Sequence, residues 1–303
     1  MGLNPYRFDS GPGHHLNRII HTQIPTIDGH NLTVDLFLPE MPGSEKLSVS
    51  IYCHGFKGFK DWGFVPHIHE FMVTENRALL TFNYSHNGVD KRDFDALDLF
   101  AENTIGQELR DMESIARWIQ EEATETYHLH PEKLDWIGHS RGGGNVWVFS
   151  ALFPQYVRKI VTWASINNYE HLFRDIDKEK WKAEGITHIT NARTQQEMPM
   201  NWMIYEEFES NRELYDIVKA AQKLDKPALI IHGSNDSAVP ILQAEKLAES
   251  CMHAIFIKVP NQDHTFGTSH PMKSLEQASH AFWLVLDNTL EFLEEEAEDQ
   301  IIA

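Results

Sequence analysis

The sequence lacks the patterns of several protein classes. It has two cysteines in 303 residues, Cys53 and Cys251, too few for a disulfide framework. We expect both to be buried thiols of a reducing compartment. No run approaches the roughly 20 apolar residues of a membrane-spanning helix, and no apolar segment follows a basic start, as a secretory signal requires. The sequence therefore predicts a cytoplasmic protein with no membrane partner.

Positive charge is scarce, because 26 Lys and Arg stand against 45 Asp and Glu, for a formal net charge of −19. This charge repels nucleic-acid phosphates, so no nucleic-acid partner is expected. There is no HExxH pattern, and the paired histidines at 14–15 and 67–69 lack the spaced carboxylate or third histidine of a zinc site. No GxGxxG follows the first expected strand. We expect neither a metal nor a cofactor.

The chain does contain short β-branched or apolar runs that alternate with helical patterns, which is typical of a parallel sheet with crossover helices. Asp28-Gly29 indicates an antiparallel hairpin between the first two runs. The order predicts an α/β fold, with a mostly parallel sheet of about eight strands flanked by helices. Expected strands cover 18–24, 32–39, 47–53, 78–84, 133–139, 159–165, 227–233 and 253–259, and expected helices 66–75, 103–123, 141–153, 240–250 and 275–296.

The stretch from 167 to 223 is longer than a crossover needs. We interpret it as an insertion of helices and a small hairpin that caps the sheet edge, because long inserts in compact domains are usually functional. The core then comprises 1–166 and 224–303. Large apolar residues of the insertion either line a substrate pocket or form the cap's own core: Trp181, Met198, Met200, Trp202, Met203, Tyr205 and Phe208.

A strand, the sequence GHSRGG and a helix follow one another around Ser140. This strand–turn–helix order is that of a nucleophile elbow, in which a sharp turn holds a reactive serine in a strained conformation. Side chains two residues before and after the serine would collide, which explains Gly138 and Gly142. Gly143 and Gly144 would let the following helix pack closely on the sheet. We predict Ser140 as a catalytic nucleophile.

A serine nucleophile needs a histidine base and an orienting carboxylate. Asp236 and His264 each follow an expected strand, and carboxyl ends of parallel strands gather at one sheet edge. They complete the predicted Ser–Asp–His set. Asp263 and Glu170 are rival acids, although Asp263 adjoins His264 and would have difficulty reaching its ring.

Two backbone N–H groups should form an oxyanion hole. One belongs to Arg141, after the nucleophile, and the other to Phe56 in the HGF loop after the third strand. The side chains of Arg141, Lys57 and Lys60 either attract an acidic substrate group or are solvated or internally paired. His232, at the end of a strand, is interpreted as a satisfied strand-end residue.

The motifs HGF, GHSRGG, HGSNDSAVP and DHTF together resemble the α/β-hydrolase superfamily, from about Leu32 to the end of the last helix. The insertion around ITNARTQQEMPMNWMIYEEF looks like the cap of the dienelactone-hydrolase-like and serine-aminopeptidase-like groups, and microbial cinnamoyl and feruloyl esterases share this layout. The resemblance implies hydrolysis of a carboxylic ester. Dienelactone hydrolases proper use a cysteine nucleophile, and haloalkane dehalogenases and epoxide hydrolases an aspartate, so serine at 140 disfavours those activities.

The leading hypothesis is a carboxylesterase that cleaves a small-molecule ester through an acyl-enzyme on Ser140; a homodimer is left open. A peptidase or amidase is the first alternative, because Glu206, Glu207 and Glu209 could recognise a free amino terminus. The second is a ligand-binding protein that retains a hydrolase pocket.

Overall fold

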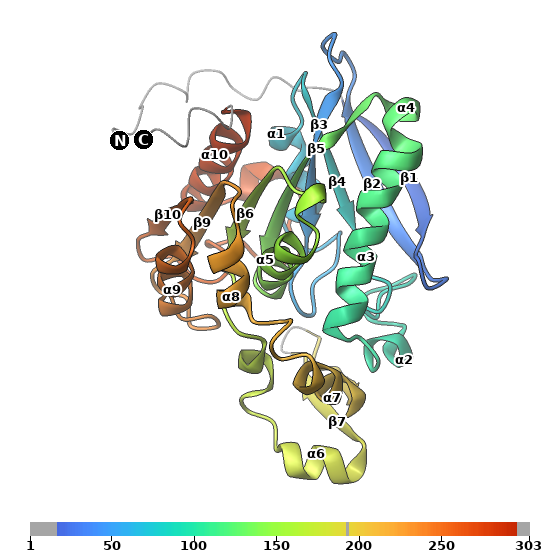
Figure 1. Cartoon of the computed structure of the whole chain (residues 1–303), viewed down its shortest axis with the longest axis vertical. Coiled ribbons are helices and arrows are strands. Elements are labelled where there is room, and N and C mark those ends of the chain that lie inside the picture. The colour runs from blue at the N-terminus through green and yellow to red at the C-terminus, as the bar shows by residue number, and fades with distance from the viewer. Residues whose placement is uncertain (1–16, 192–193, 296–303) are drawn as a thin grey trace.

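The computed structural model describes residues 17–191 and 194–295. Within them, one eight-stranded sheet has the order β1-β2-β4-β3-β5-β6-β9-β10 (Figure 1). The pairs β1–β2 and β2–β4 are antiparallel, and the other pairs are parallel. This confirms the predicted fold class. The strands are β1 (Asn17–Pro25), β2 (Asn31–Pro39), β3 (Leu47–Cys53), β4 (Arg77–Phe82), β5 (Leu129–His139), β6 (Lys159–Trp163), β9 (Ala228–Gly233) and β10 (Ala254–Val259).

Helices cover both faces of the sheet and create two apolar cores (Figure 1). Strand β3 shows the cause, because Val49 and Ile51 point into one core while Tyr52 points into the other. Helices α3 (Ile105–Trp118), α5 (Arg141–Leu152), α8 (Ile217–Lys223) and α9 (Leu242–Ser250) pack in the first core, and α1 (His69–Met72) and α10 (His280–Glu294) in the second.

Several helix ends differ from the sequence prediction. The last helix begins at His280 rather than 275, because the Ser279 side chain accepts a hydrogen bond from the Phe282 N–H and caps it. The predicted helix 103–123 is capped by Thr104, and its last turn is the π-helical η3. Short elements complete the core: α2 (Leu97–Phe100), α4 (Thr124–Tyr127), η2 (Val65–His67), η3 (Ile119–Ala123), η4 (Pro154–Tyr156) and η6 (Leu275–Gln277).

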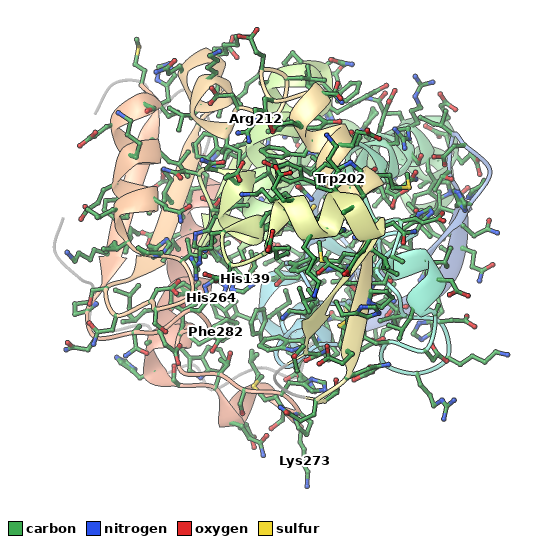
Figure 2. All side chains as sticks on the ribbon, turned by 90° about the horizontal axis from the view of Figure 1, so that it is seen from below. His139, Trp202, Arg212, His264, Lys273 and Phe282 are labelled. Atoms are coloured by element: carbon green, nitrogen blue, oxygen red, sulfur yellow. The ribbon has the colours of Figure 1, made fainter. Side chains whose placement is uncertain are left out.

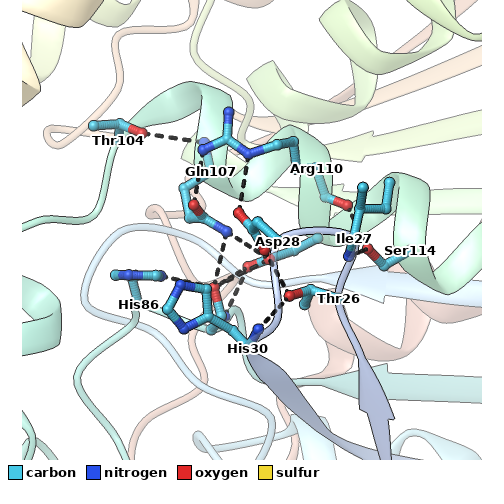
Figure 3. Close-up of polar contacts among 11 residues, drawn as sticks. Thr26, Ile27, Asp28, His30, His86, Thr104, Gln107, Arg110 and Ser114 are labelled. Carbon is cyan, nitrogen blue, oxygen red and sulfur yellow. Dashed lines mark hydrogen bonds and ion pairs between the residues drawn. The ribbon is translucent and has the colours of Figure 1, made fainter.

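The predicted hairpin turn is fastened to α3 (Figure 3). Gly29 adopts φ +88°, which favours glycine. Asp28 accepts hydrogen bonds from the Thr26 hydroxyl at 2.6 Å and from Arg110 Nε at 3.2 Å. Burial opposes ionisation of Asp28, but these bonds prevail and lower its pKa to about 2. The antiparallel edge of the sheet is thereby tied to the helical layer.

The long connection between β6 and β9 contains the predicted helices and hairpin, and Figure 1 places it beyond one end of the sheet. Strands β7 and β8 pair antiparallel, and α8 packs against α5 and α9. Its elements before α8 are η5 (Tyr169–Phe173), α6 (Lys178–Glu184), β7 (Ile186–Thr190), β8 (Glu197–Asn201) and α7 (Met203–Ser210).

The remaining expectations concern cysteines and termini. Cys53 and Cys251 are free and buried, as predicted, and burial raises the pKa of both thiols. None of the described helices has the length and apolar content needed to cross a membrane. Residues 1–16, on which the expectation of no secretory signal chiefly rests and which include the histidines at 14–15, lie outside the described residues.

Candidate active site

Ser140 lies at a sharp turn between β5 and α5. Its backbone has φ 57° and ψ −119°, a conformation that costs a non-glycine residue about 1–3 kcal/mol. The surrounding backbone holds it there, because the Ser140 N–H donates to the Trp163 carbonyl at 2.9 Å and the Ile166 N–H donates to the Ser140 carbonyl at 3.3 Å. The sharp strand–turn–helix geometry predicted from GHSRGG is present.

The glycines of the elbow permit this close packing. A Cβ on Gly142 would lie 2.3 Å from the Cys53 carbonyl oxygen, and one on Gly138 would lie 2.4 Å from the Gly142 carbonyl oxygen. A Cβ on Gly143 or Gly144 would also lie under 3.0 Å from atoms outside the helix. The collisions inferred at Gly138 and Gly142 are thus confirmed. The close packing on the sheet is confirmed for Gly143, which lies against Gly138 and Ser165, whereas Gly144 packs against Ile166 and against Ile217 of α8.

The structure brings Asp236 and His264 together. Asp236 Oδ2 lies 2.7 Å from His264 Nδ1, and Oδ1 accepts hydrogen bonds from the N–H groups of Ala238 and Val239 at 2.9 and 2.8 Å. Burial would raise the pKa of Asp236, but hydrogen bonds from His232 and His264 outweigh it and hold the pKa below its usual range. The carboxylate therefore stays charged and anchors one side of the His264 ring.

His232 is a second neighbour of this carboxylate. Its Nε2 lies 2.8 Å from the Val239 carbonyl oxygen and 3.3 Å from Asp236 Oδ2, and its side chain is fully buried. The expectation of a satisfied strand-end residue therefore holds for Nε2 but not for Nδ1, which is buried without a hydrogen-bond partner among the described residues. The contact with Asp236 was not predicted, because four-residue spacing brings side chains together in a helix, whereas His232 lies at the end of strand β9.

The two rival acids are engaged elsewhere. Asp263 Oδ1 accepts hydrogen bonds from the N–H groups of Thr265 and Gly267 at 3.0 and 2.9 Å, which closes the turn that carries His264. Glu170 forms ion pairs with Lys178 and Arg212 inside the insertion. Asp236 is thus the one of the three acids that contacts the His264 ring.

His139, for which no role is predicted from the sequence, also contacts His264. The two rings lie 4.7 Å apart, and both side chains are labelled in Figure 2. Burial and the neighbouring His264 lower the pKa of His139 to about 3, so its ring is neutral.

In the described part of the chain, the Ser140 hydroxyl forms no hydrogen bond with His264. Catalytic hydrogen bonds are often long in free enzymes and tighten when substrate binds.

The loop after β3 packs directly on the elbow. A Cβ on Gly55 would lie 3.0 Å from Ser140 Cβ, so the two segments touch. The N–H groups of Phe56 and Arg141 have no hydrogen-bond acceptor among the described residues. Two free N–H donors near a serine are what an oxyanion hole requires.

Arg141 and Lys60 are paired internally, one of the two expectations from the sequence, whereas Lys57 Nζ donates a hydrogen bond to the Thr190 carbonyl at 3.4 Å. The Arg141 side chain is buried, with Nε 2.9 Å from Glu108 Oε2. Lys60 Nζ lies 2.6 Å from Asp35 and 2.9 Å from Asp61.

A cleft of about 740 Å³ separates the loop after β3 from the insertion. Phe56 and Lys57 line one side, and His171, Trp181 and Ile189 belong to the other. The large apolar residues of the insertion mostly form its own core. Trp181, Met198, Met200, Tyr205 and Phe208 are buried there, Trp202 packs against them, and Met203 is exposed.

Among residues 17–191 and 194–295, no group of three or more His, Cys, Asp or Glu side chains could hold a metal ion. This edge of the sheet presents the Ser140 hydroxyl, the His264 imidazole, the Asp236 carboxylate and backbone N–H groups.

Comparison with known proteins identifies the family of this chain. The BD-FAE family model matches residues 34–251 of the 303. The chain belongs to the BD-FAE family. This member is 24% identical over 180 residues to the "Uncharacterized peptidase YuxL" of Bacillus subtilis (strain 168), a match that covers 56% of this chain and 24% of that relative.

Solved structures share the fold of this BD-FAE family member. Est1E from Butyrivibrio proteoclasticus with ferulic acid bound has a TM-score of 0.67 at 18% identity, covering 93% of this chain and 100% of that one. Dienelactone hydrolase from Anabaena variabilis ATCC 29413 has a TM-score of 0.59 at 17% identity, covering 92% and 97%. The resemblance to the α/β-hydrolase superfamily is confirmed.

Proposed function

We propose that this protein is a serine hydrolase that cleaves carboxylic esters through an acyl-enzyme on Ser140. The observation that carries the proposal is the strained Ser140, which adjoins Arg141 and touches the loop of Phe56, at the sheet edge where Asp236 contacts His264. Such a conformation persists only where the surrounding structure enforces it, and it is concentrated at functional sites.

In the first step, His264 Nε2 takes the Ser140 hydroxyl proton while Oγ bonds to the ester carbonyl carbon. The carbonyl π electrons move to oxygen, and the N–H groups of Phe56 and Arg141 stabilise the oxyanion. The tetrahedral intermediate collapses, the carbon–alkoxide bond breaks, and His264 gives its proton to the leaving alcohol. Water then attacks the acyl-enzyme by the same route and releases the acid.

Asp236 holds His264 with Nδ1 protonated and Nε2 free to accept a proton. It stabilises the imidazolium that forms, without itself taking the proton. Its low pKa, with the stabilising bonds from His232 and His264, supports this role.

Ester cleavage is favoured over recognition of a free amino terminus. The Glu207 carboxylate accepts a hydrogen bond from the Tyr215 hydroxyl, and Glu209 pairs with Arg212, so two of the three acids that could recognise an amino terminus are engaged. The structural neighbour Est1E binds ferulic acid, an aromatic carboxylic acid, and Phe56, whose N–H is a proposed oxyanion donor, lines the present cleft. An ester with an aromatic acyl group is a substrate to test.

We also propose that 167–223 acts as a cap over the site. Contact of its last helix α8 with α5, the helix that begins after Ser140, supports this role.

A fluorophosphonate probe and a substrate panel test the proposal. We expect covalent labelling at Ser140, turnover of p-nitrophenyl acetate and methyl ferulate, and loss of labelling and turnover in Ser140→Ala. Ser250→Ala on α9 is the control and should behave as wild type. Turnover that survives Ser140→Ala would refute the mechanism, and absence of labelling with no turnover would favour the ligand-binding alternative. Faster cleavage of aminoacyl anilides than of esters would favour the amidase.

A further inference from the structure

The Arg141 side chain occupies a position that is unfavourable for a cation unless it is compensated. It is 2% exposed, and its Nε lies 2.9 Å from Glu108 Oε2. Removing a charge from water costs several kcal/mol even after relaxation, so a buried cation needs a partner and usually has a specific role. Glu108 supplies the charge, but it does not explain why the arginine lies directly after Ser140.

Glu108 is itself fixed by a buried network. Its carboxylate accepts hydrogen bonds from Asn103 Nδ2 at 2.8 Å and Asn145 Nδ2 at 2.6 Å. The Tyr169 hydroxyl, from the insertion, donates to Asn145 Oδ1 at 2.7 Å. Arg141 is therefore held against an anion that cannot easily move.

The guanidinium also lies near the ring of Phe56. Arg141 Cζ lies 5.3 Å from the centre of that ring, within the range of a cation–π interaction. The Phe56 ring also stacks on Phe100, with ring centres 5.6 Å apart. Nε and Nη2 of Arg141 make no aligned hydrogen bond among the described residues. The guanidinium thus acts through its charge and its flat face.

We propose that Arg141 is a positioning residue, whose side chain holds the Phe56 ring and thereby sets the place of the Phe56 N–H relative to the Arg141 N–H. The residue that supplies one oxyanion donor from its backbone controls the second donor through its side chain. This inference rests on the proposed function, in which both N–H groups bind the oxyanion. It assigns a role to a side chain that neither the elbow geometry nor the Asp236–His264 pair requires.

Side-chain variants test the role, because every substitution keeps the two backbone N–H groups. Arg141→Lys retains a charge for Glu108 but lacks the flat face, and Phe56→Leu removes the ring. Removing one oxyanion donor lowers kcat by about 10²–10³-fold, so displacing one should lower it by about tenfold or more. KM for p-nitrophenyl acetate should change less than about twofold. The inhibition constant of a trifluoromethyl ketone, which forms a tetrahedral oxyanion adduct, should rise by the same factor as kcat falls.

The double variant and a matched control separate positioning from stability. If Arg141 acts through Phe56, the two effects on kcat are not additive. Arg77→Lys is the control, because Arg77 is similarly buried and pairs with Asp135 at 2.6 Å. Arg77 begins strand β4, at the end of the sheet away from Ser140. This variant should lower the melting temperature and leave kcat unchanged. Hydrogen exchange of the amides of 54–58 should be faster in both site variants.

The inference is wrong if Arg141→Lys keeps the wild-type kcat, if the variants lose activity through a higher KM, or if hydrogen exchange of the 54–58 amides is unchanged. Failure of the proposed function is a different result, in which the wild-type protein itself is neither labelled by fluorophosphonate nor active on any ester. The exchange measurement still decides the positioning role in that case, because it does not depend on turnover.

Discussion

His139 donates a hydrogen bond from Nε2 to the carbonyl oxygen of His264 at 2.9 Å. A carbonyl can only accept, and the pKa of about 3, lowered chiefly by burial, keeps the ring neutral, so the proton of His139 lies on Nε2. The residue before the proposed nucleophile therefore holds the backbone of the proposed base. This link joins the end of β5 to the loop after β10, two segments 125 positions apart in sequence.

Loss of this bond should impair turnover more than substrate binding. In His139→Leu the ring volume is roughly replaced but the donor is missing, and a hydrogen bond contributes about 0.5–1.5 kcal/mol. We expect kcat for p-nitrophenyl acetate to fall by about three- to tenfold with little change in KM. His139→Gln, whose amide can donate, should recover part of the loss, and His130→Leu, outside the site, should have no effect. Equal kcat in His139→Leu and wild type would contradict the role.

The Asp236 carboxylate should stabilise the fold in a pH-dependent way. Burial opposes its charge, but the bonds from His232 and His264 hold its pKa below the ordinary value of 3.8. Its contribution to the free energy of unfolding is therefore complete above about pH 4 and is lost as pH falls through the lower native pKa. In urea unfolding between pH 6 and pH 2.5, the advantage of wild type over Asp236→Asn should shrink toward low pH. A difference that stays constant over this range would exclude the linkage.

Local geometry explains why much of the fold and elbow could be predicted. Strand β3 contributes residues to both cores, and the sequence indicates this burial on two faces because its apolar run is flanked by helical patterns. Gly138 and Gly142 are recognisable in the sequence because the backbone contacts at these positions are too close for any larger residue. The loops carrying Asp236 and His264 follow strands β9 and β10, so the parallel sheet itself brings them to one edge.

The contacts that depend on distant residues could not be predicted. Arg141 and Glu108 are 33 positions apart (141 − 108), and nothing local to either residue indicates the other. The same holds for His139 and His264. The start of α10 was misplaced because an apolar pattern continues through Leu275, whereas the Ser279 cap sets the boundary.

The elbow should not tolerate a side chain at Gly142. A Cβ there would lie 2.3 Å from the Cys53 carbonyl oxygen and 2.5 Å from that of His54, which are backbone atoms of the predicted oxyanion loop. Gly142→Ala should lower the free energy of unfolding by about 1–3 kcal/mol or more and reduce kcat, because the loop must move. Gly185→Ala is the control: its φ is +75° but no atom lies within 4 Å of the added Cβ, so it should cost about 1–2 kcal/mol without changing kcat. Chemical denaturation and ester turnover measure both effects, and wild-type kcat in Gly142→Ala would contradict the expected movement.

Asp111 on α3 should make the protein less stable as pH rises toward neutrality. Its side chain is buried, and although it accepts hydrogen bonds from the Ser85 N–H at 2.7 Å and from Gln107 Nε2 at 3.1 Å, burial raises its pKa to about 7. Between the ordinary value of 3.8 and about 7, the native state holds a proton that the unfolded state releases. Stability therefore falls as pH rises through this window and levels off above it. Asp111→Asn removes the titration, so its melting temperature relative to wild type should increase from pH 4 to pH 7. A pH-independent difference between Asp111→Asn and wild type would mean that the carboxyl has the same pKa in both states.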